Sequence, residues 1–194
     1  MTTESPLRAA VLETPRLVLR PMRSQDAVVH HRLWRERDPR VPAHRRPDEH
    51  GRPTVADLSA QLAAAGAASE ADPSAPALLG VVLRETSATL GYCGLSTQGP
   101  GGTAEPELAF ELLRACHGQG LGTECATAVV SLARTQGHPR LWATVWDWNE
   151  PSRRVLASLG FREVQRRDVG QAVSLTTVLS LRDEGGDERV GVLS

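Results

Sequence analysis

A loop with three glycines in six residues links a predicted strand to a predicted helix in this chain. The loop spans 117–122 and reads His-Gly-Gln-Gly-Leu-Gly, and residues 123–135 after it place apolar side chains at helical spacing. Because glycines put no Cβ atoms in the way, several backbone N–H groups and the positive end of the helix dipole converge on one point. The pattern predicts an anion site, with a plain strand-to-helix turn as the alternative.

The spacing of these glycines disfavours a dinucleotide-binding βαβ unit. That unit needs G-x-G-x-x-G and an acidic residue about 20 residues later on a second strand. The glycines here follow G-x-G-x-G over 118–122, and the strands predicted before them form hairpins. A different phosphate-binding fold is therefore expected.

Hydrophobic periodicity and turn residues predict a mixed α+β domain with helices packed on one central sheet. Asp26 and Thr54 stand where helix caps are expected. A long loop is predicted at 38–53, another loop at 70–76 and a glycine-rich loop at 99–102. We expect one domain over 1–182 and an acidic, flexible tail over 183–194. The predicted strands are 16–20, 78–84, 90–95, 107–112, 141–146 and 173–181, and the predicted helices are 27–34, 54–65, 123–135 and 151–159.

Composition excludes several classes of function. The 22 basic residues are all arginine. A P-loop and a pyridoxal phosphate Schiff base both need a lysine, so neither is possible here. The formal net charge is −1, with no long basic stripe, so nucleic acid is not expected as a partner.

Cysteine and histidine usage gives no sign of a metal site or a disulfide framework. Cys93, Cys116 and Cys125 are odd in number and form no CxxC pair, which favours reduced thiols. Four histidines lack ligand spacing and are expected at the surface: His30, His31, His44 and His50. The chain start carries no basic region followed by an apolar stretch, and no run of about 18 apolar residues occurs. We expect a cytoplasmic protein that does not enter a membrane.

Four motifs follow one another in a characteristic order. Residues 13–21 read Glu-Thr-Pro-Arg-Leu-Val-Leu-Arg-Pro, with Asp26 shortly after, and residues 90–95 read Leu-Gly-Tyr-Cys-Gly-Leu. The glycine loop continues as Gly-Leu-Gly-Thr-Glu-Cys over 120–125. Asn-Glu-Pro-Ser at 149–152 precedes a predicted helix, and Leu-Gly-Phe at 159–161 follows it. Together these motifs resemble the GNAT superfamily of N-acetyltransferases, and within it the RimJ/RimL group that acetylates protein N-terminal amines.

The resemblance implies a GNAT fold: a central, mostly antiparallel, twisted sheet of about seven strands with a V-shaped splay, flanked by helices. Strand 107–112 is then expected to splay from strand 141–145, with the pantetheine of acetyl-CoA, the implied co-substrate, between them. No metal is implied. His117 replaces the family's Gln or Arg but leaves the backbone amides intact. The residues implied to bind the co-substrate are Phe110, Leu112, His117, Gly118, Gln119, Gly120, Leu121, Gly122, Thr123, Asn149 and Ser152.

The implied chemistry is direct attack of an amine on the thioester, which calls for a base, an oxyanion donor and an acid for the leaving thiolate. A backbone amide within 110–112 is expected to face the thioester oxygen. Glu107 and Glu111 share a strand face and are the candidate bases, or else plain solvent-facing residues. Many relatives carry a tyrosine acid on the helix after the Asn, but Leu156 occupies that place. Ser152 is therefore the candidate acid, or else an ordinary first-turn residue.

The acceptor stays open at this point. Loop 38–53 is rich in Arg and His, which suits a carboxylate-bearing acceptor or a peptide start better than a polycation. The alternatives are a small amine (a polyamine, an amino acid or an aminoglycoside) and a non-catalytic acyl-CoA-binding module. The resemblance also suggests a homodimer. Trp142 and Trp146 share strand parity and are expected in the core, whereas Trp148 is expected to line the cleft.

Overall fold

The computed structural model describes residues 11–72, 75–102, 105–170 and 172–182 of the 194-residue chain. The tail expected at 183–194 lies outside these residues. Within them, eight strands form one sheet in the order β1-β2-β3-β4-β5-β6-β8-β7. The strands are β1 (Leu12–Glu13), β2 (Leu17–Pro21), β3 (Leu78–Leu83), β4 (Thr89–Gly101), β5 (Glu105–Leu112), β6 (Arg140–Trp146), β7 (Arg162–Val169) and β8 (Ala172–Ser180). The helices are α1 (Ala27–Glu36), α2 (Val55–Ala71), α3 (Leu121–Thr135) and α4 (Glu150–Ser158), with short 3-10 turns η1 (Ser24–Asp26), η2 (Ala43–Arg45) and η3 (Arg114–Cys116).

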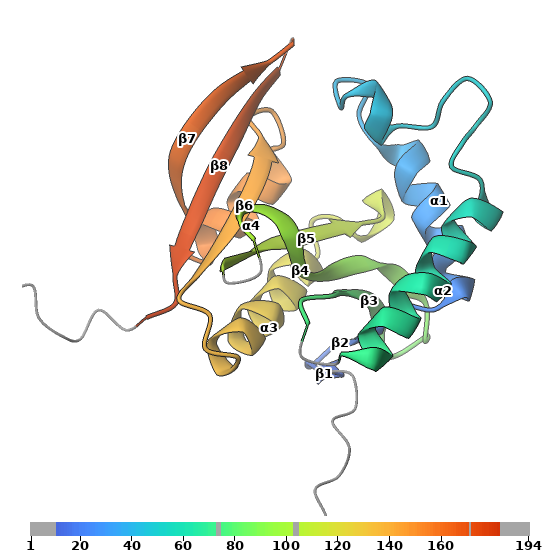
Figure 1. Ribbon diagram of the computed structural model, residues 1–194, viewed down its shortest axis with the longest axis horizontal. Coiled ribbons are helices and arrows are strands. Elements are labelled where there is room, and N and C mark those ends of the chain that lie inside the picture. Colours follow the sequence, from blue (N-terminus) through green and yellow to red (C-terminus); the bar gives the residue numbers. More distant parts are fainter. Residues whose placement is uncertain (1–10, 73–74, 103–104, 171, 183–194) are drawn as a thin grey trace, which may run out of the picture.

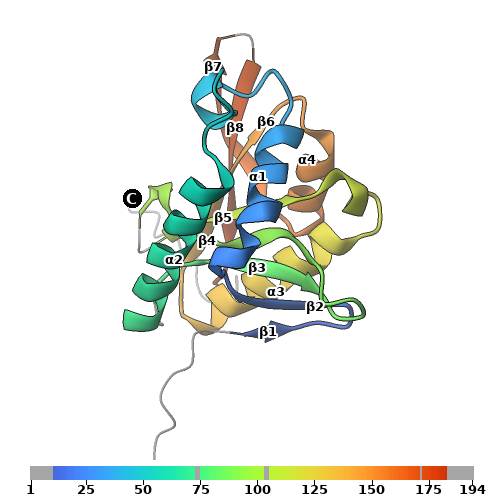
Figure 2. The ribbon, with the colours of Figure 1, turned by 90° about the vertical axis from the view of Figure 1, so that its right-hand side faces the viewer.

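The sheet is antiparallel at every junction except β5–β6, which is parallel. β1 and β2 lie at one end of it and β7 and β8 at the other (Figures 1 and 2). The predicted hairpin of strands 78–84 and 90–95 is confirmed, with Leu79 opposite Cys93. The expected mostly antiparallel α+β sheet is likewise confirmed.

Alternating side chains give the sheet two apolar layers. On β4, Cys93 is fully buried in the larger core, which includes Val129 of α3 and Leu156 of α4. Its neighbour Tyr92 points to the other face and packs on a smaller cluster with Leu62 of α2. Figure 1 shows α1 and α2 side by side at one side of the molecule and α4 with β6–β8 at the other.

The splay expected in the sheet lies between β5 and β6. In the described residues these two strands share one register pair, Glu107 opposite Trp142. Both strands then continue, β5 to Leu112 and β6 to Trp146, without a further paired position. The open end of the splay therefore lies at the carboxyl ends of both strands.

Strand β7 is a feature that the sequence analysis missed. Its residues Arg162–Val169 are exposed or half-buried throughout, so they show no alternation of apolar and polar side chains. β7 is an edge strand that pairs only with β8 along the described chain. Main-chain hydrogen bonding, rather than a buried face, holds it in the sheet, and a hydrophobic pattern cannot reveal that.

The expectation that Trp142 and Trp146 lie in the core is wrong. The buried positions of β6 are Leu141, Ala143 and Val145, so the two tryptophans lie half-buried on the opposite face. They do share a parity, as predicted. Three smaller apolar side chains fill the space against the helices instead.

Several local predictions are also corrected or confirmed. β4 extends to Gly101 and α2 to Ala71, so parts of the loops predicted at 99–102 and 70–76 are regular structure. Thr54 does cap α2, since its Oγ1 accepts a hydrogen bond from the Asp57 amide at 3.2 Å.

Asp26 and His30 also depart from their expected roles. Asp26 precedes α1 but does not cap it with its side chain; the carboxylate instead binds the Arg20 guanidinium and the Arg23 amide. His30 is buried rather than exposed. Its ring stacks on Tyr92 at 5.2 Å, and its Nε2 lies 3.0 Å from the sulfur of Met22.

Candidate active site

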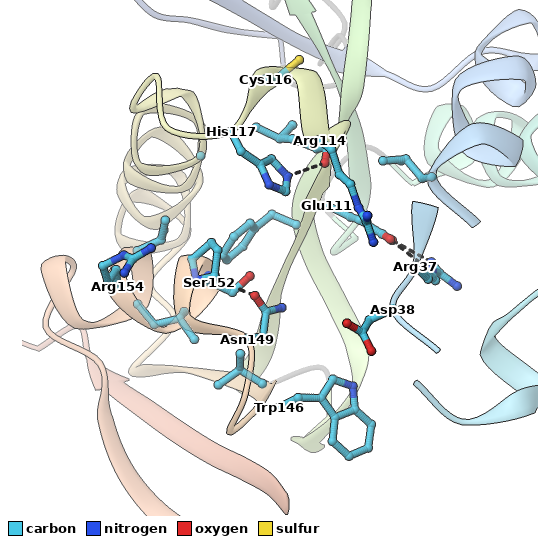
Figure 3. A pocket seen from close by; sticks show the side chains of 18 of the residues that line it. Arg37, Asp38, Glu111, Arg114, Cys116, His117, Trp146, Asn149, Ser152 and Arg154 are labelled. Atoms are coloured by element: carbon cyan, nitrogen blue, oxygen red, sulfur yellow. Dashed lines mark hydrogen bonds and ion pairs between the residues drawn. The ribbon is translucent and has the colours of Figure 1, made fainter. Parts of the chain in front are cut away.

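A cleft with a volume of about 680 Å³ lies at the open end of the β5–β6 splay. The ends of β5 and β6 form its floor, and the amino-terminal ends of α3 and α4 line one side. The end of α1 and residues 38–45 line the opposite side (Figure 3). Because β5 and β6 are parallel, their carboxyl ends and the helices that follow meet at the same edge, a common place for ligand sites in open sheets.

The glycine loop opens α3 through two left-handed residues. Gly118 has φ +75° and Gly120 has φ +76°, a region that costs about 1–2 kcal/mol for a residue with a Cβ atom. In the described part of the chain, the N–H groups of Gly118 and Gly120 have no hydrogen-bond partner. His117 anchors the loop, with Nε2 2.9 Å from the carbonyl oxygen of Leu112. Free N–H groups beside a helix amino terminus form an arrangement that binds phosphate groups.

The amino terminus of α4 brings the motif Asn149 to Ser152 to the same cleft. The side-chain oxygen of Asn149 accepts a hydrogen bond from the Ser152 amide at 3.3 Å, so Asn149 is the helix cap. The Ser152 hydroxyl lines the cleft and, among the described residues, has no hydrogen-bond partner. Ser152 thus contributes its amide to the cap, and its hydroxyl is left for another role.

The two candidate bases on β5 have different surroundings. Glu111 lines the cleft, where both its oxygens accept hydrogen bonds from Arg37 at 2.9 and 2.7 Å and one also accepts from the Tyr92 hydroxyl at 3.1 Å. Glu107 does not line the cleft. Its Oε1 accepts from the Thr144 amide at 2.8 Å and so links β5 to β6 where the splay begins.

The other carboxylates of the cleft are also engaged. Glu36 accepts from Arg32 and from the Arg114 amide; burial acts to raise its pKa, but these hydrogen bonds outweigh it and the pKa lies below the usual range. Asp38 accepts from the side chain and amide of Arg40, which hold its pKa well below the usual range. All three cleft carboxylates in the described chain therefore bind a guanidinium group.

An aromatic wall closes the end of the cleft beyond β6. Trp146 and Trp148 lie parallel, with ring centroids 6.5 Å apart and an interplanar angle of 1°. The guanidinium carbon of Arg40 lies 4.2 Å above the Trp148 ring, a cation–π contact across the cleft. Segment 38–41 therefore bridges from the α1 side to the β6 side, and Trp148 lines the cleft as predicted.

The structure brings most of the sequence-predicted site residues into this one cleft. Two of them lie outside its lining, Gln119 and Glu107. The side chain of Gln119 turns back to the Ala115 carbonyl. The predicted residues that line the cleft are Phe110, Glu111, Leu112, His117, Gly118, Gly120, Leu121, Gly122, Thr123, Asn149 and Ser152.

Sequence reasoning missed the residues from α1 and its exit that complete the cleft. Arg37, Asp38 and Arg40 lie at the end of a helix and the start of a loop that is rich in charge throughout. The acceptor preference inferred from the Arg and His content of loop 38–53 pointed to this region but could not single out these residues. Tyr92 was noted only as part of a strand motif, and its parity opposite the buried Cys93 could have placed it on the cleft side.

A family model for the acetyltransferase (GNAT) domain matches residues 16–162, which covers the glycine loop, both strands of the splay and all of α4. The chain belongs to the GNAT acetyltransferase family. The fold class expected from the sequence is confirmed, and so is the enzyme class, an acetyl-CoA-dependent N-acetyltransferase. A search of curated proteins gives no match.

Solved GNAT structures share this fold over nearly the whole chain. A GNAT-family acetyltransferase from Bordetella pertussis is 25% identical, with a TM-score of 0.67 over 87% of this chain and 98% of its own. RimJ from Mycobacterium smegmatis, in complex with CoA-disulfide, is 20% identical, with a TM-score of 0.69 over 91% and 90%. The ribosomal-protein-S5-alanine acetyltransferase from Vibrio fischeri is 17% identical, with a TM-score of 0.68 over 90% and 98%.

Among the described residues, no group of three or more His, Cys, Asp or Glu side chains is placed to hold a metal ion. None of the helices in residues 11–72, 75–102, 105–170 and 172–182 is both long and apolar enough to cross a bilayer.

Proposed function

We propose that this acetyltransferase transfers the acetyl group of acetyl-CoA to the N-terminal α-amine of a protein or peptide. The proposal rests on the carboxylates that line the cleft. Each of them in the described chain is already bound by a guanidinium group. An acceptor with several ammonium groups, such as a polyamine or an aminoglycoside, needs free carboxylates to replace its hydration. The N-terminus of a peptide carries a single amine and does not need several free carboxylates.

The acidity of the amine supports the same acceptor. An α-amine has a pKa of about 8, so roughly a tenth of it is neutral at pH 7, whereas a lysine-type amine with a pKa of about 10.4 is neutral in fewer than one molecule in a thousand. Both oxygens of Glu111 are engaged by Arg37, and Glu107 lies outside the cleft lining. We therefore assign proton removal to water in the cleft, which suffices for an α-amine.

The chain's own residues supply the remaining steps. The amides of 118–122 hold the diphosphate, and a backbone N–H within 110–112 donates to the thioester oxygen. As the amine nitrogen bonds to the carbonyl carbon, the carbon–sulfur bond breaks and the Ser152 hydroxyl protonates the leaving sulfur, regaining a proton from water. The stacked pair Trp146 and Trp148 offers an apolar surface for the first side chains of a peptide.

Some structural neighbours are protein acetyltransferases, which is in line with this acceptor class. Their sequence identities to this chain are low, so they show the fold alone. They include the S5-alanine acetyltransferase and RimJ described above, and RimL, a ribosomal L7/L12 α-N-protein acetyltransferase solved with coenzyme A. Membership of the RimJ/RimL group, a homodimer and a cytoplasmic location stay predictions.

The test measures CoA release from acetyl-CoA with three kinds of acceptor. These are peptides with a free N-terminus and no lysine, the same peptides N-acetylated and carrying one internal lysine, and a set of polyamines and aminoglycosides. We expect turnover with the first kind and at least 100-fold lower kcat/KM with the others. Faster turnover of a polyamine or an aminoglycoside would assign the small-amine function instead. Tight acetyl-CoA binding without turnover of any amine would identify a non-catalytic acyl-CoA-binding module.

A further inference from the structure

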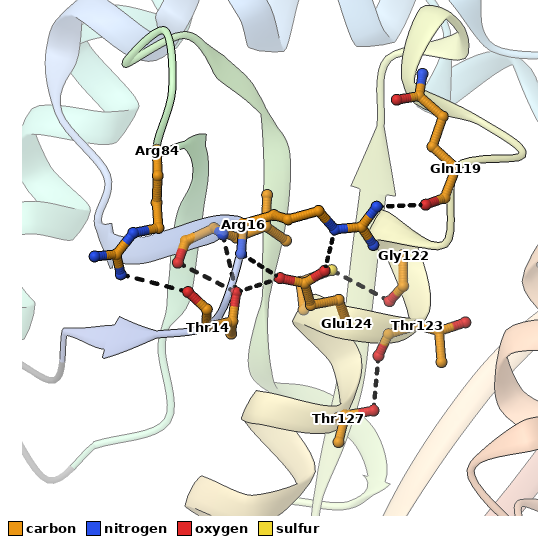
Figure 4. A network of polar contacts seen from close by, with 10 residues as sticks. Thr14, Arg16, Arg84, Gln119, Gly122, Thr123, Glu124 and Thr127 are labelled. Carbon is orange, nitrogen blue, oxygen red and sulfur yellow. Dashed lines mark hydrogen bonds and ion pairs between the residues drawn. The ribbon is translucent and has the colours of Figure 1, made fainter.

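Two sequence motifs that lie over a hundred residues apart meet behind the glycine loop. The segment Glu13 to Pro21 forms the end of β1, the turn after it and β2. Gly120 to Cys125 forms the cap and first turn of α3. Figure 4 shows Thr14 and Arg16 of the first motif facing Glu124 of the second. These residues do not line the cleft, so the site as described so far gives them no role.

Glu124 is the centre of this contact. Its Oε1 accepts from the Thr14 hydroxyl at 2.6 Å and from the Arg16 amide at 2.9 Å, while its Oε2 accepts from Arg16 Nε at 2.7 Å. The Glu124 side chain is 14% exposed. Burial acts to raise its pKa, but the hydrogen bonds from Thr14 and Arg16 outweigh it and the pKa lies below the usual range. Glu124 is thus a charged acceptor with all its close donors on one short segment.

Arg16 extends the contact to the loop itself. Its Nη1 donates to the Gln119 carbonyl oxygen at 2.9 Å. In a trans peptide the C=O and the following N–H point in opposite directions. A Gln119 carbonyl turned toward Arg16 therefore fixes the Gly120 N–H on the opposite side, away from Arg16, and that N–H has no partner in the described chain.

The charges of the pair matter for an anion in front of the loop. Glu124 lies in the first turn of α3, where a bare carboxylate would compete with a bound phosphate for the positive end of the helix. The Arg16 guanidinium offsets that charge, and its Nη2 lies only 3.5 Å from where a Cβ atom on Gly120 would be. Both the orientation of the peptide and the charge behind the loop thus depend on Arg16.

We infer that Arg16, held by Glu124, is a positioning residue for co-substrate binding: it sets the Gln119–Gly120 peptide so that the Gly120 amide faces the diphosphate of acetyl-CoA. The inference rests on acetyl-CoA as the co-substrate and not on which amine is the acceptor.

The test compares Arg16→Met with wild type in two measurements. Calorimetric titration with CoA measures binding without turnover, and we expect the dissociation constant to rise roughly tenfold, the usual effect of losing one charge-assisted contact. Steady-state rates then compare acetyl-CoA with S-acetylpantetheine, which lacks the diphosphate. The KM for acetyl-CoA rises while kcat and the KM for the amine stay near wild type, and kcat/KM for S-acetylpantetheine is unchanged.

Two further variants separate positioning from general stability. Arg84→Met removes a neighbouring guanidinium that binds Glu13 at 2.9 Å and the Thr14 carbonyl oxygen at 3.4 Å. This guanidinium contacts neither Glu124 nor the glycine loop, so CoA affinity stays at the wild-type value. Arg16→Met combined with Glu124→Gln recovers part of the affinity, because the uncompensated carboxylate is gone.

Two results would overturn the inference. One is a folded Arg16→Met protein with wild-type CoA affinity, and the other is an equal loss of kcat/KM for acetyl-CoA and S-acetylpantetheine. If Arg16→Met fails to fold, Arg16→Lys replaces it, because a single ammonium cannot reach both Glu124 and Gln119. Failure to acetylate peptides leaves the CoA titration interpretable, so the acceptor proposal and this inference can fail separately.

Discussion

The Arg37 guanidinium binds both carboxylate oxygens of Glu111 through two parallel hydrogen bonds, from Nε to Oε1 at 2.9 Å and from Nη2 to Oε2 at 2.7 Å. The two side chains are 11% and 25% exposed. The pair joins the end of α1 to the end of β5 and so fixes one side of the cleft to its floor. We regard it as part of the cleft's architecture rather than as its acid–base machinery.

Arg37→Met is expected to lower the free energy of unfolding by about 2–3 kcal/mol, because it leaves Glu111 partly buried without its cation. Arg37→Lys recovers less than half of this loss, since an ammonium cannot form the two-pronged contact. Urea denaturation of the three proteins at pH 7 checks the order. An Arg37→Met protein as stable as wild type would show that the Arg37–Glu111 pair makes no net contribution to the free energy of unfolding.

Ser152→Ala is expected to lower kcat by about 100-fold, the lower end of what a general acid contributes. Its unfolding free energy should change by less than about 0.5 kcal/mol, because the helix cap uses the Ser152 amide and not its hydroxyl. Asn149→Ala is the matched variant, and it loses about 1 kcal/mol with the cap. A Ser152→Ala enzyme with wild-type kcat would remove the acid assignment.

Gly91→Ala is expected to cost more than about 2 kcal/mol and to impair the cleft, because a Cβ atom there would lie 2.1 Å from the Glu111 carbonyl oxygen and 2.9 Å from the Leu112 Cα. Gly137→Ala controls for backbone strain: its φ is also positive, at +77°, but nothing lies within 4 Å. We expect about 1 kcal/mol for that variant. Thermal and urea unfolding compare the two, and equal losses would show that crowding at Gly91 is unimportant.

Buried His30 is expected to make stability fall in mild acid. Burial lowers its pKa in the folded chain, an effect that outweighs the opposing influence of Glu111 and Asp26. The unfolded chain then binds a proton more readily than the folded one, so stability is present above the unfolded pKa of about 6.5 and is lost as the pH falls below it. Urea midpoints between pH 8 and 5 should drop less in His30→Gln than in wild type. Parallel curves would contradict this assignment.

The elements with a buried face could be predicted from the sequence, and those without one could not. β3, β4, β6 and α3 each carry an apolar periodicity that follows from packing on the larger core. β7 has no such face, and it was missed. For Trp142 and Trp146 the sequence pattern predicted correctly that both side chains lie on the same face of β6, but not which face. The face that packs against the helices carries the smaller side chains of β6, and the two bulky indoles lie on the opposite face.

The parts of the cleft that are formed by short, local sequence motifs could be predicted from the sequence. The glycine loop and the Asn149 cap depend on residues close in sequence, and the structure places both at the cleft. Arg37 on Glu111 and Arg16 on Glu124 join residues 74 and 108 positions apart. Arginine occurs throughout the chain, so composition and spacing cannot tell which guanidinium meets which carboxylate.

The single register pair of β5 and β6 has a consequence for how the molecule meets other chains. A strand with unpaired backbone groups normally lies at the outer rim of a sheet, where it can recruit another protein into an aggregate. Beyond Glu107 and Trp142, the described chain has two such strand edges facing each other inside the fold, with only the Thr144 N–H bound across the gap, by the Glu107 side chain. A folded partner is too wide to enter, whereas a slender molecule that carries its own amide groups can. The fold thus keeps its unpaired strand backbone inside a narrow cleft, where the width of a molecule decides whether it can bind.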